Sequence, residues 1–373
     1  PYPAPMPSTL HFLRHFLFPD PDAVVRSEVT YRRDKETLAA SLYRPGRAAG
    51  ARPLPGWVAL HGLTHTGRDH RSLDGLARAL AASGTAVLVP DIPEWRELHV
   101  APDAAAATIR AAVPALADRA GVDGDRVGVM GFSFGGAQAL VAATEPDLAS
   151  RMAAVVSWGG YADLRRAARF LFLGEHELDG TRYHAQPDPY GRWILAGNYL
   201  TLVPEHRDDG ALANALRALA REVGRRGVMA WEPATDPWKT EARATLDARQ
   251  REIFDLLAPP AGTSLTERQR ERVAGIVDRM CDAAMAAVPR LDPAPHLPGV
   301  AVPVFLAHGR DDRLFPWTEL ERLRRAIPES CVRHAVVTGL FAHSFRERRF
   351  PTPRMGVEAV RFVRAIRRMI RLI

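Results

Sequence analysis

Cysteine, lysine and long apolar runs are all scarce in this sequence. It contains only two cysteines, Cys281 and Cys331, which offer neither a disulfide framework nor a C-x-x-C metal motif. No run approaches the eighteen or so apolar residues that suggest a membrane span, and no charged leader followed by an apolar stretch opens the chain. We therefore expect a cytoplasmic protein without stable membrane insertion, with the removal of an upstream signal peptide left open.

The positive charge comes almost entirely from arginine. Lys35 and Lys239 are the only lysines among 50 basic residues, and the net charge is +7. A basic chain can attract nucleic acid. Here, however, the arginines are dispersed among acidic residues, and we find no zinc-finger spacing and no RNA-binding aromatic motif. We expect no nucleic-acid partner.

Short apolar runs alternate with helical patterns along much of the chain. With 47% hydrophobic residues in 373, a large core can form without metal or disulfide support. The alternation predicts a mostly parallel, doubly wound α/β sheet. The predicted strands lie at residues 57–60, 86–89, 127–130, 153–157, 302–307 and 332–337, after a helix at 8–18 and an antiparallel pair within 24–43, and a terminal helix starts near 353.

The alternation stops after Trp158 and resumes only at Val302. This interval is more than a hundred residues longer than a simple crossover requires, which indicates an inserted subdomain. Its apolar residues recur at helical spacing, and Ser264 with Glu267 forms a capping-box pattern. We expect a first core segment at 1–160, a helical insertion at 161–298 and a second core segment at 299–373.

The strongest chemical signal is Gly131-Phe132-Ser133-Phe134-Gly135, which follows a predicted strand and precedes a helical stretch. In such a nucleophile elbow a serine lies on a strained turn, and the flanking glycines avoid collisions with neighbouring backbone. We therefore predict Ser133 as a nucleophile, against the alternative of an ordinary glycine-rich turn.

Two backbone N–H groups should stabilise the oxyanion that this nucleophile produces. The N–H of Phe134 is one of them, and the N–H of Leu63 is our first choice for the other, with that of Thr64 as the alternative.

An acid and a base follow in the order that this arrangement needs. Asp311 and Asp312 both come after the strand at 302–307, and the residues alone leave the choice between them open. His343 comes after the next strand, with room for one helix and one strand in between. His308 and His334 are poorer candidates for the base, because one lies beside a strand end and the other within a strand.

Three histidines lie close together in the sequence at His61, His65 and His70. His61 and His65 have the spacing that a helix could turn into a pair of metal ligands. The glycines between and after them favour a loop instead, and only Asp69 is a nearby further ligand. We expect no metal and no cofactor.

Taken together, the His61-Gly62 loop, the Gly131 to Gly135 elbow, the segment from His308 to Asp312 and His343 resemble the α/β-hydrolase superfamily. The likeness covers roughly residues 25–160 and 298–373. It implies the α/β-hydrolase fold: a mostly parallel eight-stranded sheet with helices on both faces, and a helical cap inserted after the sixth strand. It also implies no cofactor and favours Asp312 as the acid. Bacterial relatives of carboxylesterases and dienelactone hydrolases look closest, although dienelactone hydrolases have cysteine where this chain has Ser133.

We accordingly expect a serine hydrolase that cleaves a small carboxylic ester with an apolar acyl or aryl group through an acyl-enzyme. The same triad could serve a peptidase, a thioesterase or an acyltransferase. A non-catalytic binding protein on this fold and a membrane-associated, lipase-like enzyme are the further alternatives. The sequence does not indicate an oligomeric state.

Overall fold

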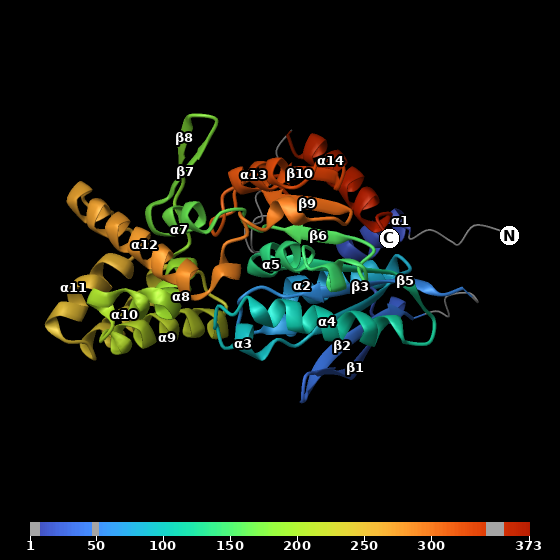
Figure 1. Ribbon diagram of the computed structural model, residues 1–373, viewed down its shortest axis with the longest axis horizontal. Helices are drawn as coiled ribbons and strands as arrows, with labels where there is room; N and C mark the ends of the chain where they lie inside the picture. Colours follow the sequence, from blue (N-terminus) through green and yellow to red (C-terminus); the bar gives the residue numbers. More distant parts are fainter. Residues whose placement is uncertain (1–7, 47–51, 341–353) are drawn as a thin grey trace.

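An eight-stranded sheet forms the centre of the computed structural model, which describes residues 8–46, 52–340 and 354–373 (Figure 1). The strand order is β1-β2-β4-β3-β5-β6-β9-β10. Only β2 runs against its neighbours, and all other pairs in the sheet are parallel. The predicted α/β-hydrolase fold with its mostly parallel eight-stranded sheet is confirmed. The strands are β1 (Val24–Arg33), β2 (Glu36–Pro45), β3 (Leu54–Leu60), β4 (Ala86–Pro90), β5 (Val122–Phe132), β6 (Val155–Trp158), β9 (Val304–Gly309) and β10 (Val332–Thr338).

Helices cover both faces of this sheet, so its central strands are buried on both sides. In β3, for example, Val58 and Leu60 contribute to one core cluster, while Trp57 and Ala59 contribute to the other. This two-sided burial explains why the strands read as continuous apolar runs. The first face carries α3 (Pro93–Arg96), α4 (Asp103–Ala117), α5 (Phe134–Ala142), α6 (Pro146–Ala149) and α13 (Thr318–Ala326), and the second carries α1 (Thr9–Leu17), α2 (Arg71–Ala82) and α14 (Arg354–Ile370).

The residues between β6 and β9, which we call the insertion, lie beside the sheet (Figure 1). Most of the insertion is helical, as expected, but it also contains a two-stranded hairpin that the sequence did not predict. The domain limits at 160 and 298 remain a prediction. The elements are α7 (Leu164–Leu173), β7 (Glu175–Leu178), β8 (Thr181–His184), α8 (Pro189–Tyr199), α9 (Gly210–Arg226), α10 (Asp236–Ala244), α11 (Ala248–Leu257) and α12 (Glu267–Ala287).

The start of α12 differs from its expected form. The capping box consists of Thr266 and Gln269, whereas the sequence favoured Ser264 with Glu267. The Thr266 hydroxyl accepts the Gln269 N–H at 3.3 Å, and the Gln269 side-chain carbonyl accepts the Thr266 N–H at 2.9 Å. Ser264 with Glu267 and Thr266 with Gln269 both have the three-residue spacing of a capping box, so the sequence alone does not distinguish them. The residue at which the helix begins determines which pair forms.

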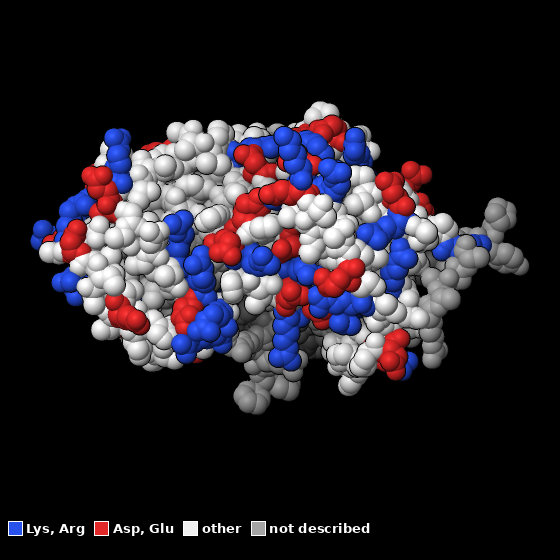
Figure 2. Space-filling model, turned by 90° about the horizontal axis from the view of Figure 1, so that it is seen from below, with Lys and Arg blue, Asp and Glu red and all other residues white. Residues whose placement is uncertain are grey.

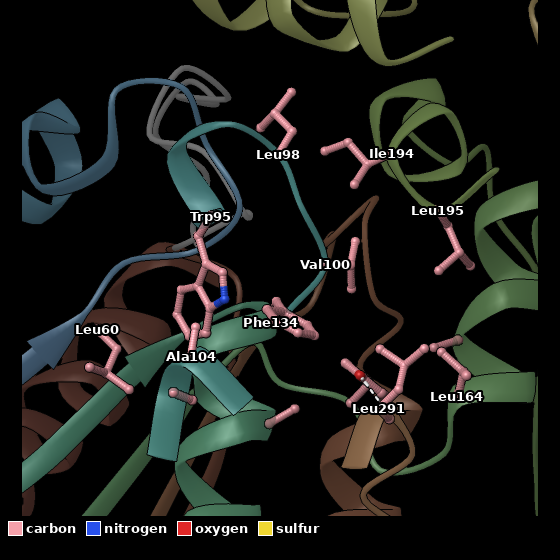
Figure 3. Close-up of a cluster of buried hydrophobic side chains, with 14 of the residues drawn as sticks. Leu60, Trp95, Leu98, Val100, Ala104, Phe134, Leu164, Ile194, Leu195 and Leu291 are labelled. Carbon is pink, nitrogen blue, oxygen red and sulfur yellow. Dashed lines mark hydrogen bonds between the residues drawn. The ribbon is translucent and has the colours of Figure 1, made fainter. Parts of the chain in front are cut away.

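A buried apolar cluster joins the insertion to the sheet (Figure 3). Leu98 and Val100, in the loop that follows α3, lie opposite Ile194 of α8 (Figure 3). The same cluster continues through Trp95 to Phe134 at the start of α5, and their rings meet edge to face at 5.2 Å between centroids. The insertion therefore shares one core with the helices on the first face of the sheet.

Basic and acidic side chains are interspersed over the face seen in Figure 2. Exposed arginines also form ion pairs: Arg110, for example, pairs with both Glu145 and Asp147. Within the described parts of the chain, no helix has the length and apolar character needed to cross a membrane.

One buried carboxyl group ties the insertion to α13. The Glu319 side chain is 1% exposed, and its Oε2 accepts the N–H groups of Ala162 at 2.9 Å and Asp163 at 3.3 Å. Burial raises the pKa of Glu319 to about 7, and the Arg322 guanidinium, 3.6 Å away, opposes this shift. The carboxyl group thus titrates near neutrality while holding the beginning of the insertion.

Replacing Glu319 by glutamine should stabilise the protein above pH 7. A raised pKa means that the folded state binds a proton more tightly than the unfolded state, so the parent loses stability as pH rises from 4.5 to 7. Glutamine keeps an acceptor oxygen without the charge. We expect a gain in unfolding free energy of up to about 3 kcal/mol at pH 8, and little difference at pH 4.5, by urea denaturation. Equal stabilities of the two proteins at pH 8 would contradict the raised pKa of Glu319.

Candidate active site

Ser133 occupies a strained turn between β5 and α5. Its φ of 57° and ψ of −125° lie in a region that non-glycine residues rarely adopt. The Ser133 N–H donates to the Trp158 carbonyl at 2.8 Å, and the Ser133 carbonyl accepts the Gly136 N–H at 2.9 Å. The turn is therefore held on one side by β6 and on the other by the first turn of the helix.

Glycines let three backbone segments meet at this turn. A side chain at Gly131 would overlap the carbonyl oxygen of Gly135, and a Cβ at Gly135 would lie 2.7 Å from the His61 carbonyl oxygen. At Gly62, a Cβ would come within 3.3 Å of the Ser133 Cβ. The loop of residues 61–64, which we call the oxyanion loop after the role predicted for it from the sequence, therefore lies in contact with Ser133. The structure brings the predicted nucleophile, Phe134 and this loop together.

His61 holds the oxyanion loop from within. The side chain is 1% exposed, its Nε2 accepts the Ile92 N–H at 3.2 Å, and its Nδ1 lies 2.7 Å from the Gly62 carbonyl oxygen. Because a carbonyl only accepts, Nδ1 carries the proton. Burial lowers the pKa of His61 to about 4, so the ring is neutral at physiological pH.

These contacts leave both ring nitrogens of His61 occupied, which argues against a role in metal binding. Among the residues that the structure describes, no group of three or more His, Cys, Asp or Glu side chains could hold a metal ion. Asp69, the further ligand considered from the sequence, accepts a hydrogen bond from Arg26.

Asp312 is the more buried of the two candidate acids. It is 5% exposed, whereas Asp311 is partly exposed. The Asp312 Oδ1 accepts the N–H groups of Leu314 at 2.8 Å and Phe315 at 3.0 Å, which fixes the carboxylate within its own loop. His308 braces the same loop, with its Nε2 2.9 Å from the Phe315 carbonyl oxygen.

Ser133 and Asp312 follow strands that end at the same edge of the sheet. Phe132 pairs with Trp158 of β6, and Trp158 pairs with Ala307 of β9. Two strand spacings separate the two loops, which corresponds to about 10 Å. His343 lies outside the described residues. The chain reaches it from β10, whose last residue is registered against Gly309 at the end of β9.

One residue near the oxyanion loop was not identified from the sequence. The hydroxyl of Tyr190, in the first turn of α8, donates to the Leu63 carbonyl at 2.9 Å. The contact spans 127 positions of the chain, and no motif surrounds Tyr190. Only the placement of the insertion on the core reveals it.

Comparisons with known proteins agree with the fold. A family model described as the alpha/beta hydrolase fold matches residues 58–343. No curated protein matches the sequence. Among solved structures, an acylaminoacyl peptidase from Pyrococcus horikoshii is 13% identical, with a TM-score of 0.51, over 95% of this chain and 43% of its own. A puromycin hydrolase is 16% identical, with a TM-score of 0.50, over 94% of this chain and 39% of its own. This chain thus spans less than half the length of either protein, and at these identities the likeness shows the fold alone.

Replacing Gly131 by alanine should disrupt the turn around Ser133. The new methyl group would collide with backbone atoms, which cannot move aside as a flexible side chain can. We expect a loss of at least about 1–3 kcal/mol in unfolding free energy, measured by chemical denaturation. Gly124→Ala is a matched control in the same strand, since its Cβ would lie 3.5 Å from the nearest atom. Equal losses in the two variants would contradict the crowding at Gly131.

His61 should make the protein sensitive to acid. A lowered pKa means that the unfolded state binds the proton more tightly, so stability falls as pH drops from 6.5 through 4. The expected contribution is up to about 3 kcal/mol. His61→Asn keeps a donor near the Gly62 carbonyl but does not titrate. The stability advantage of the parent over this variant should therefore shrink between pH 7 and pH 4 in urea denaturation, and a constant advantage would refute the assignment.

Proposed function

This chain belongs to the α/β-hydrolase family, and on that premise we propose that it is a serine hydrolase that cleaves carboxylic esters through Ser133, His343 and Asp312. The observation that carries the proposal is the strained Ser133 turn with the oxyanion loop in contact with it. Such a turn exposes a hydroxyl at the end of a central strand and places backbone N–H groups around it.

In the first chemical step, the Ser133 hydroxyl attacks the ester carbonyl while His343 takes its proton. The negative charge that develops on the carbonyl oxygen is stabilised by the N–H of Phe134 and by that of Leu63. His343 then gives the proton to the departing alcohol. An acyl-enzyme on Ser133 remains.

In the second step, water attacks the acyl-enzyme with His343 again acting as base, and the acid product leaves with Ser133 restored. Asp312 holds the imidazole in the required tautomer and stabilises its charged form. The geometry of Asp312 supports this assignment over Asp311, because two backbone N–H groups orient its buried carboxylate. Asp311, which is more exposed, is the alternative.

An apolar acyl or aryl group suits the partly buried residues that the loops and the insertion contribute. Leu63 and Leu314 follow β3 and β9, and the Tyr190 hydroxyl bonds to the Leu63 carbonyl. These residues pack against the apolar cluster shared by the insertion and the sheet. Peptidase, thioesterase and acyltransferase activities would use the same first step, so the leaving group has to be determined by experiment.

A fluorescent fluorophosphonate, which reacts with activated serines, tests the nucleophile without knowledge of the substrate. We expect labelling of the parent and no labelling of Ser133→Ala, because only the activated hydroxyl attacks the probe. Ser150→Ala removes an exposed serine hydroxyl that bonds to the Asp147 carbonyl, and it should label like the parent. Absence of labelling in all three proteins would favour a non-catalytic binding protein.

The class of substrate follows from rates on matched compounds with the same acyl group. Among compounds that share an acyl group, we expect kcat/KM to be highest for the aryl ester and lower for the thioester and the anilide. In a second series of aryl esters, we expect kcat/KM to increase with acyl length over short chains. A peptide anilide that is cleaved faster than the esters would replace this assignment by a peptidase.

A further inference from the structure

Two tyrosines of α8 reach from the insertion to loops of the sheet. The Tyr190 hydroxyl donates to the Leu63 carbonyl at 2.9 Å, and the Tyr199 hydroxyl donates to the Val100 carbonyl at 2.6 Å. Both contacts join the same helix to a backbone carbonyl of the core. Only Tyr190 contacts the oxyanion loop, whereas Tyr199 contacts the loop that follows α3.

The peptide groups on both sides of Leu63 are each held by a side chain. His61 contacts the Gly62 carbonyl from the core, and Tyr190 contacts the Leu63 carbonyl from the insertion. Because a peptide unit is planar, fixing its carbonyl also fixes the direction of its N–H group. His61 thus orients the N–H of Leu63, and Tyr190 orients that of Thr64 while fixing Leu63 itself.

The surroundings of Tyr190 leave its hydroxyl little freedom. Asp188 caps α8 by accepting the Tyr190 N–H at 3.0 Å, and the Asp188 N–H donates to the Arg313 carbonyl at 2.8 Å. A Cβ on the next residue, Gly191, would lie 3.0 Å from the Leu314 side chain. The first turn of α8 therefore rests on the loop that carries Asp312 while its tyrosine reaches the oxyanion loop. Burial raises the pKa of the Tyr190 phenol, so that it stays a donor.

We propose that Tyr190 is a positioning residue for ester cleavage: its hydroxyl holds the oxyanion loop so that the loop's N–H groups face the developing oxyanion. This inference rests on the function proposed above. It implies that the oxyanion site is complete only while the first turn of α8 is seated on the core. Tyr190 acts through Leu63 and does not itself contact the substrate.

The test compares Tyr190→Phe with Tyr199→Phe, which each remove one hydroxyl and one hydrogen bond between the insertion and the core. Rates on a short aryl ester are normalised to active sites titrated with fluorophosphonate, so partial misfolding does not affect them. We expect Tyr190→Phe to lower kcat/KM about 10-fold, mostly in kcat, as for the loss of one well-placed hydrogen bond. This loss is smaller than the 10²–10³-fold typical of removing an oxyanion donor outright. Tyr199→Phe should stay within about 2-fold of the parent.

A trifluoromethyl ketone supplies a readout that a merely structural role would not change. It forms a tetrahedral oxyanion on the serine and mimics the transition state, so its affinity should fall by the same factor as kcat/KM in Tyr190→Phe. Equal effects of the two tyrosine variants, or an unchanged ketone affinity, would overturn the inference and leave Ser133 as the nucleophile. Full activity in Ser133→Ala would overturn the proposed function, and this inference with it.

Discussion

The site depends on the contact between two stretches of bare backbone. The oxyanion loop passes the turn at Ser133 so closely that Gly135 has no space for a larger side chain and that a Cβ at Gly62 would crowd the Ser133 side chain. Under the proposed function, this contact would supply the oxyanion donors from backbone N–H groups and not from flexible side chains, so that they are ordered before any substrate arrives. His61, Trp95 and Phe134 support the contact from below, with edge-to-face ring contacts from His61 to Trp95 and from Trp95 to Phe134.

A single helix of the insertion touches three of the loops around this contact. Through Tyr190, Asp188 and Tyr199, α8 binds the loops that follow β3, β9 and α3. This is possible because the carboxyl ends of parallel strands meet along one edge of the sheet, so loops that are distant in sequence become neighbours. The pairing of Arg221 with Glu97 adds a further link between the insertion and the loop after α3.

The elements that could be predicted from the sequence are those in which the local pattern of apolar residues reflects which side chains are buried. Strands buried on both faces gave continuous apolar runs, and the elbow at Ser133 carried its glycines at fixed offsets, so both were predicted. The β7/β8 hairpin was missed because the residues of β8, Thr181–His184, are all exposed and show no apolar alternation. The cap of α12 was placed two residues early, since Ser264 and Thr266 both begin a valid capping pattern. The contact of Tyr190 with Leu63 depends on how the insertion docks, which no local pattern encodes.

The shared apolar cluster also limits how far the insertion can move relative to the sheet. Leu164, Ile194, Leu195 and Leu291 of the insertion are buried in one cluster with Leu98 and Val100 of the core (Figure 3). If each such side chain contributes about 1.5–3 kcal/mol, swinging the whole insertion outward would cost roughly 10 kcal/mol. That approaches the total stability of a typical domain, about 5–15 kcal/mol. Displacing the insertion as a rigid body would therefore cost about as much free energy as unfolding a typical domain, so the insertion and the sheet behave as one folding unit.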